Sequence, residues 1–325
     1  MGEKSNTTAR DRITGLALGG LGVLGFSMSL PATRIAVGEI DPWVVAFGRA
    51  VGAGLMAWAY LRVTGAPRPT AAQWRRLAVV AAGVVVGFPL FTSLALTTQT
   101  AAHGAVVITV LPAATAVFAV LRAGERPPPA FWIASGAGLA AALAFMVASS
   151  GVTGAATPTD LFLLAAVVLC GLGYAEGGSL ARELGGARTI CWALVLSLPV
   201  TVPVAAVAAL VHPPRSDTAG WLGFGYLTVV SMFLGFFAWY AGLARGGIAR
   251  IGQIQLAQPV LTLAWSALLL NEPVTPLAIG TSMLVLACVA LTQRARGSGP
   301  AREHRPAADT SHPATRIATG TGADR

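Results

Sequence analysis

Ten apolar stretches of about 20 residues each divide this chain, and they restrict the fold more than any other feature. A stretch of this length suits a helix that crosses the hydrocarbon core of a membrane, which is about 30 Å thick. Only 11% of the residues are charged, whereas a soluble domain carries about 25%. The alternation of apolar and polar residues that is typical of membrane β-barrels is absent from these runs. The sequence therefore predicts an all-α integral membrane protein with ten transmembrane helices, at residues 13–33, 42–62, 77–97, 101–122, 129–149, 160–181, 189–211, 220–243, 250–270 and 274–293.

The chain also repeats itself. Pro112 and Glu125 recur 147 residues later as Pro259 and Glu272. Each copy holds five apolar stretches, and an odd number of spans turns the second copy upside down relative to the first. We therefore expect two inverted five-helix repeats, an arrangement typical of secondary transporters. The expected divisions are a cytoplasmic N-terminal segment 1–12, a first repeat 13–150, a second repeat 159–293 and a disordered cytoplasmic tail 294–325.

The net charge of +9 follows the expected membrane topology. Nineteen of the 22 lysines and arginines lie in the N-terminal segment, the C-terminal tail and the loops between them on the same side. Positive residues concentrate on the cytoplasmic side of membrane proteins, so both termini are expected in the cytoplasm of a multi-pass inner-membrane protein. This distribution favours lipid, and not nucleic acid, as the partner of the basic residues. The first apolar stretch continues past the length of a signal peptide and is expected to be retained.

Several classes of function lack their sequence motifs. There is no G-x-x-x-x-G-K-[ST] run for ATP, no H-E-x-x-H zinc motif and no pair of aspartates within the apolar stretches. The three cysteines Cys170, Cys191 and Cys288 each fall inside an apolar stretch, at spacings that suit neither a metal site nor a disulfide. We expect no enzyme activity, no metal and no cofactor.

Three features together resemble a known family: the run DPWVVAFGRA that opens the second span, a proline inside the fourth and ninth spans, and a glutamate after each of those spans. They resemble the EamA-type members of the drug/metabolite transporter superfamily over residues 13–293. The resemblance implies a ten-helix bundle with a central cavity between inverted halves. It also implies a secondary active transporter that moves a small amphipathic solute, such as an amino-acid-like metabolite or a drug, by alternating access, often outward. The alternatives are a lipid or lipid-linked sugar translocase of the same fold, and a non-transporting membrane scaffold.

The ninth span carries a polar stripe on an otherwise apolar helix. Gln255, Gln258, Thr262 and Ser266 fall on one face at 100° per residue. Amide and hydroxyl groups suit a neutral or zwitterionic solute, so the stripe is a candidate lining of a substrate cavity. The alternative is that these side chains only form hydrogen bonds to neighbouring helices.

Arg49 lies seven residues into the second span, roughly 10 Å below the outer surface. An arginine at that depth is costly and is expected to face the protein interior. Its role is either structural, as a donor to carbonyl groups at helix ends, or functional, as the partner of a substrate carboxylate. The matching position in the second repeat is Leu196, so the repeat fold alone does not require the charge.

Glu176, near the inner end of the sixth span, is the candidate proton-coupling carboxylate. The alternative is that it reaches the inner interface and pairs with a cytoplasmic arginine. Coupling to protons and assembly as a homodimer both stay open from the sequence.

Glu125 and Glu272 close the fourth and ninth spans on opposite faces of the membrane. A carboxylate at the C-terminal end of a helix opposes the helix dipole, so each is expected to be held by another group, such as the N-terminus of a facing helix. Pro112 and Pro259 each remove a helix hydrogen bond and should kink their spans. These four residues are candidates for hinge or gating roles.

Three aromatic residues, Tyr174, Trp239 and Tyr240, are further candidates for the substrate cavity. His103 begins the fourth span and is expected to be a solvated residue at a helix end.

Overall fold

The computed structural model describes residues 2–123, 158–246 and 254–297, with Ile251 and isolated positions between 129 and 144. All regular secondary structure in this described part is helical, which confirms the all-α prediction. Seven of its helical stretches are long and apolar enough to cross a membrane, and the apolar helix α14 (Gln258–Leu270) is shorter. Most of the expected fifth span and the chain beyond residue 297 lie outside the described residues.

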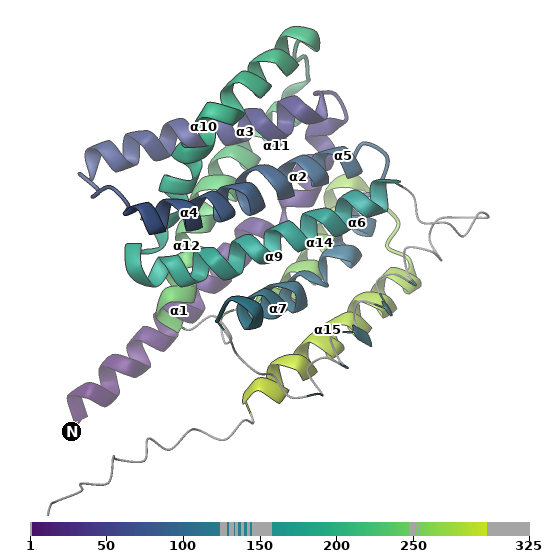
Figure 1. Cartoon of the computed structure of the whole chain (residues 1–325). Helices are drawn as coiled ribbons and strands as arrows, with labels where there is room; N and C mark the ends of the chain where they lie inside the picture. Colours follow the sequence, from purple (N-terminus) through teal and green to yellow (C-terminus); the bar gives the residue numbers. More distant parts are fainter. Residues whose placement is uncertain are drawn as a thin grey trace, which may run out of the picture.

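The described helices run in chain order through both halves (Figure 1). The first half contains α1 (Gly2–Ser27), α2 (Ser29–Val37), α3 (Pro42–Val63), α4 (Ala71–Val80), α5 (Phe88–Ala95), α6 (Ala101–Ile108) and α7 (Leu111–Ala123). The second half contains α9 (Pro158–Leu184), α10 (Gly186–Val211), α11 (Thr218–Tyr226), α12 (Gly235–Gly246), α14 and α15 (Pro276–Gly297). The last helix therefore continues past residue 293, where the second repeat was expected to end.

Short polar caps fix where several helices begin. The Asp41 carboxylate accepts hydrogen bonds from the backbone N–H groups of Trp43 and Val44, and Pro42 supplies a first helical residue with no N–H to satisfy. Thr70 and Gln73 form a reciprocal capping box at the start of α4. These caps satisfy backbone donors at helix starts, which would otherwise lack partners.

Both halves interrupt their third span in the same way. The π-helical segment Ala81–Gly87 joins α4 to α5, and the π-helical segment Leu227–Leu234 joins α11 to α12. The glycine and phenylalanine that follow match in sequence, as Gly87 and Phe88 in one half and Gly235 and Phe236 in the other. π-Helical turns are rare and often occur at functional sites, so this matched pair marks a constrained region.

The fourth span of each half is broken at the same repeat position. α6 ends at Ile108 and α7 begins at Leu111, and 147 residues later a 3₁₀ turn at Gln255–Ala257 precedes α14, which begins at Gln258. Pro112 and Pro259 are each the second residue of the new helix, where a missing N–H costs nothing. The two prolines therefore start half-helices near the middle of the bundle.

Pro31 explains a third interruption, between α1 and α2. A proline has no N–H for the carbonyl four residues earlier, which here is that of Ser27. The Thr262 hydroxyl donates to this carbonyl oxygen at 2.7 Å, and the Trp265 indole N–H donates to Ser27 Oγ at 3.0 Å. A side chain of α14 thus satisfies the backbone oxygen that the break in the first span exposes.

The helices pack through extensive contacts across the two halves. α3 lies against α10, α1 lies against α12, and α9 runs between α4, α5 and α7 (Figure 1). Gly83 lets its segment approach α9 closely, because a Cβ there would lie 3.0 Å from the Cα of Gly173. Such small residues permit the close backbone contact that holds membrane helices together.

Candidate functional site

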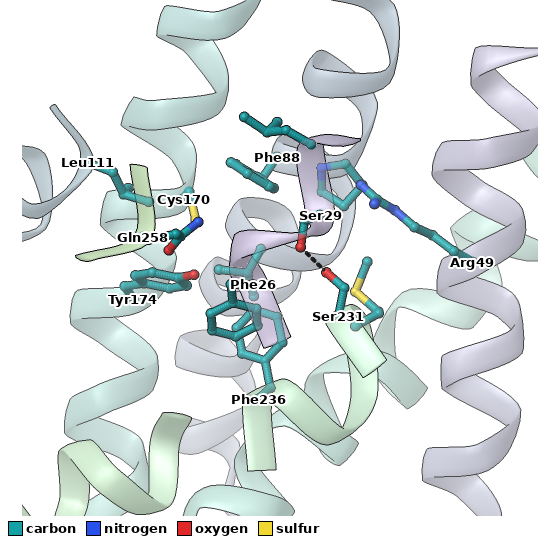
Figure 2. A pocket seen from close by; sticks show the side chains of 14 residues that line it. Phe26, Ser29, Arg49, Phe88, Leu111, Cys170, Tyr174, Ser231, Phe236 and Gln258 are labelled. Atoms are coloured by element: carbon teal, nitrogen blue, oxygen red, sulfur yellow. Dashed lines mark hydrogen bonds between the residues drawn. The ribbon is translucent and has the colours of Figure 1, made fainter. Parts of the chain in front are cut away.

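A cavity lies inside the bundle where the interrupted helices meet (Figure 2). Its volume open to a water-sized sphere is about 20 Å³, roughly enough for one water molecule, so the cavity is nearly closed. Its lining includes residues from each kind of interruption: Ser29 beside the α1–α2 break, Val84 and Ser231 in the π-helical segments, and Leu111 and Gln258 at the starts of half-helices. Irregular backbone at membrane depth is tolerated where it borders a cavity, so this placement is physically consistent. The full lining is Phe26, Ser29, Leu30, Arg49, Val84, Phe88, Pro89, Leu111, Cys170, Tyr174, Ser231, Met232, Phe236 and Gln258.

Arg49 and Gln258 give this cavity its unsatisfied polarity. Both side chains are buried, with 2% and 6% of their surfaces exposed. Within the described part of the chain, Arg49 Nε and Nη2 and Gln258 Oε1 have no hydrogen-bond partner. A buried polar group without a partner costs about 1–3 kcal/mol, and more when it is charged. The two side chains therefore leave donors and an acceptor available for a bound molecule.

The half-helices add a favourable field for negative charge. α7 begins at Leu111 and α14 begins at Gln258, and both residues line the cavity. The N-terminus of a helix carries a partial positive charge, and broken membrane helices commonly direct it towards anionic groups. Together with the Arg49 guanidinium, these termini make the cavity more favourable for an anion than for a cation.

The rest of the lining is mostly apolar and aromatic. Phe26 stacks on Tyr174 with ring centroids 6.3 Å apart, and Phe236 lies 4.9 Å from Phe26. Ser29 and Ser231 bind each other across the two halves at 2.7 Å (Figure 2). The site therefore pairs a small polar region with a larger apolar one.

Of the three aromatic candidates, Tyr174 lines the cavity and the other two pack behind it. Trp239 lies 5.6 Å from the Tyr174 ring, and Tyr240 lies 5.4 Å from the Phe236 ring. The Tyr240 hydroxyl donates to the carbonyl oxygen of Gly173 at 3.3 Å. Trp239 and Tyr240 thus support the aromatic wall from behind.

The polar stripe of the ninth span is buried as a whole, but its members do different things. Gln258 lines the cavity, whereas Gln255, Thr262 and Ser266 are not among the lining residues. Thr262 donates to Ser27, and the Ser266 hydroxyl donates to the carbonyl oxygen of Thr262 at 2.9 Å. Gln255 Nε2 has no partner among the described residues.

Glu176 lies towards the end of the bundle where α4 begins, and it forms an ion pair with Arg76. The same arginine donates to Glu183 at 2.6 Å and to Ser179 at 2.8 Å. Glu176 is absent from the cavity lining, and its contact with Arg76, in the middle of α4, matches the alternative interpretation from the sequence. This network joins α4 of the first half to α9 of the second.

Glu272 joins the halves at the opposite end. Its carboxylate accepts hydrogen bonds from the backbone N–H groups of Ala101 and Ala102, at the start of α6. This partner, the N-terminus of a facing helix, is the one that the sequence analysis expects. Glu125, its counterpart in the first repeat, lies outside the described residues.

One largely buried pair was missed by the sequence analysis. His103 was expected to be solvated, but its side chain is 10% exposed and its Nε2 lies 2.8 Å from Asp160 Oδ1. The Asp160 side chain is 1% exposed. The pair connects α6 to the first turn of α9, where the helix dipole favours a carboxylate. The sequence shows only that each residue lies near the start of a helix, in different halves of the chain. It does not show that the two side chains meet.

Comparison with known proteins identifies the family. Residues 13–147 and 157–293 each match the EamA-like transporter family. The chain is 45% identical over 280 residues to the uncharacterized transporter YdeK of Bacillus subtilis (strain 168), which covers 85% of this chain and 96% of the relative. It is 23% identical over 245 residues to an uncharacterized transporter of Archaeoglobus fulgidus, with 74% and 83% covered. A crystal structure of another protein shares the fold, with a TM-score of 0.61 at 19% identity over 88% of this chain and 99% of that one. The protein is therefore a multi-pass membrane protein of two-repeat architecture that belongs to the EamA-like transporter family, within the drug/metabolite transporter superfamily.

Proposed function

We propose that this protein is a secondary transporter that exports a small amphipathic solute, an amino-acid-like metabolite or a drug, across the inner membrane by alternating access. One observation carries the proposal: Arg49 and Gln258 are buried in one largely apolar cavity and keep hydrogen-bonding atoms without partners. A fold that needed these groups only for stability would satisfy them internally.

The lining favours a solute with three parts. A carboxylate or another anionic group suits Arg49, since a guanidinium forms strong charge-assisted hydrogen bonds with such groups. An N–H or O–H donor suits Gln258 Oε1. An apolar or aromatic part suits the wall formed by Phe26, Phe88 and Phe236.

The shape of the cavity supports a small solute over a lipid. Its volume open to a water-sized sphere is about 20 Å³, roughly enough for one water molecule, so this closed conformation must open to admit even a small solute. Two grooves on the outside of the described part of the bundle share no lining residue with this cavity. A lipid translocase would require a lateral opening that connects the cavity to the outside of the bundle.

Alternating access requires contacts between the halves that open at one end while those at the other end stay closed. The Arg76–Glu176 network and the Glu272–α6 contact lie at opposite ends, and each joins the first half to the second. The matched helix interruptions support a pair of repeats, and the distribution of basic residues supports an inverted pair with cytoplasmic termini. Pro112 and Pro259, at the broken spans, are the proposed hinges, and Glu125 and Glu272 are proposed gating residues on opposite faces of the membrane.

The driving force is a separate part of the proposal. Uptake of a proton by Glu176 would break its ion pair with Arg76 and loosen one contact between the halves. Flux measured with and without a proton gradient, in the wild type and in Glu176→Gln, tests this coupling. Assembly as a homodimer is a further prediction, and a measurement of the mass of the protein in detergent tests it.

The transport proposal is tested in two steps. An untargeted comparison of metabolites in cells with and without the protein identifies candidate solutes, and counterflow in proteoliposomes measures their transport. We expect Arg49→Ala and Gln258→Leu each to abolish counterflow while expression persists. Arg62→Ala is the matched control, because Arg62 lies on the same helix but is exposed. Wild-type flux in both cavity variants would show that the cavity assignment is wrong.

A further inference from the structure

A second hollow lies on the outside of the bundle, at the end where α9 stops and α10 starts. Its volume open to a water-sized sphere is about 630 Å³. It is bordered by α1, α3, α10 and α12, and it shares no lining residue with the central cavity. We call it the lateral groove, and its lining is Leu18, Leu21, Tyr60, Leu184, Gly185, Gly186, Ala187, Arg188, Leu234, Phe237, Ala238, Ala241 and Arg245.

The floor of the lateral groove is apolar and faces outward. Leu21 is 60% exposed and Leu234 is 49% exposed. Phe237 packs edge-on against Tyr60 with ring centroids 5.0 Å apart. In a membrane-spanning bundle, side chains exposed at this depth contact hydrocarbon chains, so the floor suits an acyl chain.

The rim of the lateral groove is positively charged. Arg188, in the first turn of α10, and Arg245, in the last turn of α12, are both exposed. Neither forms an ion pair with a described residue, and the lining contains no acidic residue. Two guanidinium groups without an ionic partner among the described residues, beside an apolar groove, therefore match a molecule with an anionic head and an apolar tail.

Two glycines stand at the start of α10, just before Arg188. Gly185 has a φ of 85°, a conformation that other residues rarely adopt, and it places no side chain at the start of α10. A Cβ on Gly186 would lie 2.8 Å from the carbonyl carbon of Tyr240, so the glycine also lets α10 approach α12 closely. The two glycines therefore add no side chain of their own to the edge of the lateral groove next to Arg188.

We propose that the lateral groove binds one anionic phospholipid, with its phosphate between Arg188 and Arg245 and an acyl chain along Leu21, Leu234 and Phe237. Basic pockets between membrane helices on the cytoplasmic side bind anionic lipid head groups, and the distribution of basic residues places this end of the bundle on that side. A zwitterionic lipid offers the same chains without net charge, and free phosphate offers the charge without chains. The lipid is a bound partner and not the transported solute, since its groove is separate from the central cavity.

Native mass spectrometry of the purified full chain in detergent tests this inference. The probes are dioleoyl phosphatidylglycerol, dioleoyl phosphatidylcholine, dihexanoyl phosphatidylglycerol and inorganic phosphate. We expect saturable binding of one dioleoyl phosphatidylglycerol and much weaker binding of the other three. The double variant R188Q/R245Q should bind it about thirtyfold more weakly, since each arginine near a charged lipid surface contributes a factor of about five.

The matched control is R68Q/R75Q, which removes the same charge from exposed positions at the same end of the bundle but outside the lateral groove. It should keep wild-type binding. All four positions are exposed, so thermal unfolding without added lipid should be the same in both variants and the wild type. Equal loss of binding in the two variants would overturn the proposal in favour of general surface charge. Equal binding of phosphatidylcholine, or binding of inorganic phosphate alone, would also overturn it.

Discussion

Glu272 Oε2 accepts a hydrogen bond from the backbone N–H of Ala102 at 2.9 Å, and this contact ties the end of α14 to the start of α6. The other carboxylate oxygen accepts from Ala101 at 3.0 Å. A negative charge at a helix N-terminus is stabilising, and here the helix belongs to the other half of the protein. The contact is therefore both a helix cap and a connection between the halves.

Replacement of Glu272 by Gln should lower the stability of the protein, because it removes the charge from the α6 terminus and one of two good acceptors. We expect a loss of about 1–2 kcal/mol, seen as a lower midpoint of thermal unfolding in detergent. Glu39→Gln is the comparison, because the Glu39 carboxylate also accepts from a backbone N–H, that of Asp217, but is exposed. An equal effect of the two substitutions would contradict a special role for Glu272.

The ion pair between Arg76 and Glu176 should be visible in a double-mutant cycle. Arg76→Gln and Glu176→Gln should each destabilise the protein, and the double variant should lose less than the sum of the two. The expected coupling is about 0.5–3 kcal/mol, the range for residues in one ionic network. Arg75→Gln, next to it in sequence and exposed, should show no coupling to Glu176→Gln. Strictly additive effects of Arg76 and Glu176 would mean that the contact contributes nothing.

The buried pair His103–Asp160 predicts a graded response to substitution. His103→Leu removes a hydrogen-bond partner from a buried carboxylate and should cost about 1–3 kcal/mol in the free energy of unfolding. His103→Gln keeps a side-chain N–H donor and should recover part of that loss. Thermal unfolding of both variants checks the order, and a more stable Leu variant would disprove it.

Gly83 should not tolerate a side chain. A Cβ at this position would meet the carbonyl oxygen of Leu169 and lie 3.0 Å from the Cα of Gly173, and backbone atoms cannot move aside cheaply. We expect Gly83→Ala to cost about 1–3 kcal/mol by forcing the third span away from α9. In Gly20→Ala the added Cβ has no neighbour within 4 Å, so stability should stay the same or rise by up to about 1 kcal/mol. Equal unfolding midpoints for the two variants would refute the close approach.

The helical membrane fold could be predicted because its signals are local. Long apolar runs define the spans, and the repeated interval from proline to glutamate defines the two copies. The π-helical segments could not be predicted, because Ala81–Gly87 has no distinctive composition and its geometry depends on packing against neighbouring helices. Helix breaks were predicted in part: Pro112 and Pro259 each leave a carbonyl without its usual donor, whereas the break beside Pro31 was not predicted and the first span was expected to be continuous.

Residues of the candidate site could be predicted from the sequence only where a single side chain is unusual for a membrane helix. Arg49 and Gln258 stand out because a charge and an amide are costly inside apolar helices. Ser29 and Ser231 do not stand out, and their contact joins positions 202 residues apart. Thr262 belongs to the same polar stripe as Gln258, but its hydroxyl donates to the carbonyl oxygen of Ser27, which Pro31 leaves without a backbone donor. Which polar group faces the cavity therefore depends on what its neighbours need.

The positively charged side chain in the cavity, Arg49, comes from the first half alone, since Leu196 stands at the matching position in the second half. The two repeats can thus share a backbone pattern without sharing their charges. Under the proposed transport cycle, a solute whose anionic group binds Arg49 keeps that group at the same side chain while the cavity opens first to one side of the membrane and then to the other. It has no need to turn over between loading and release.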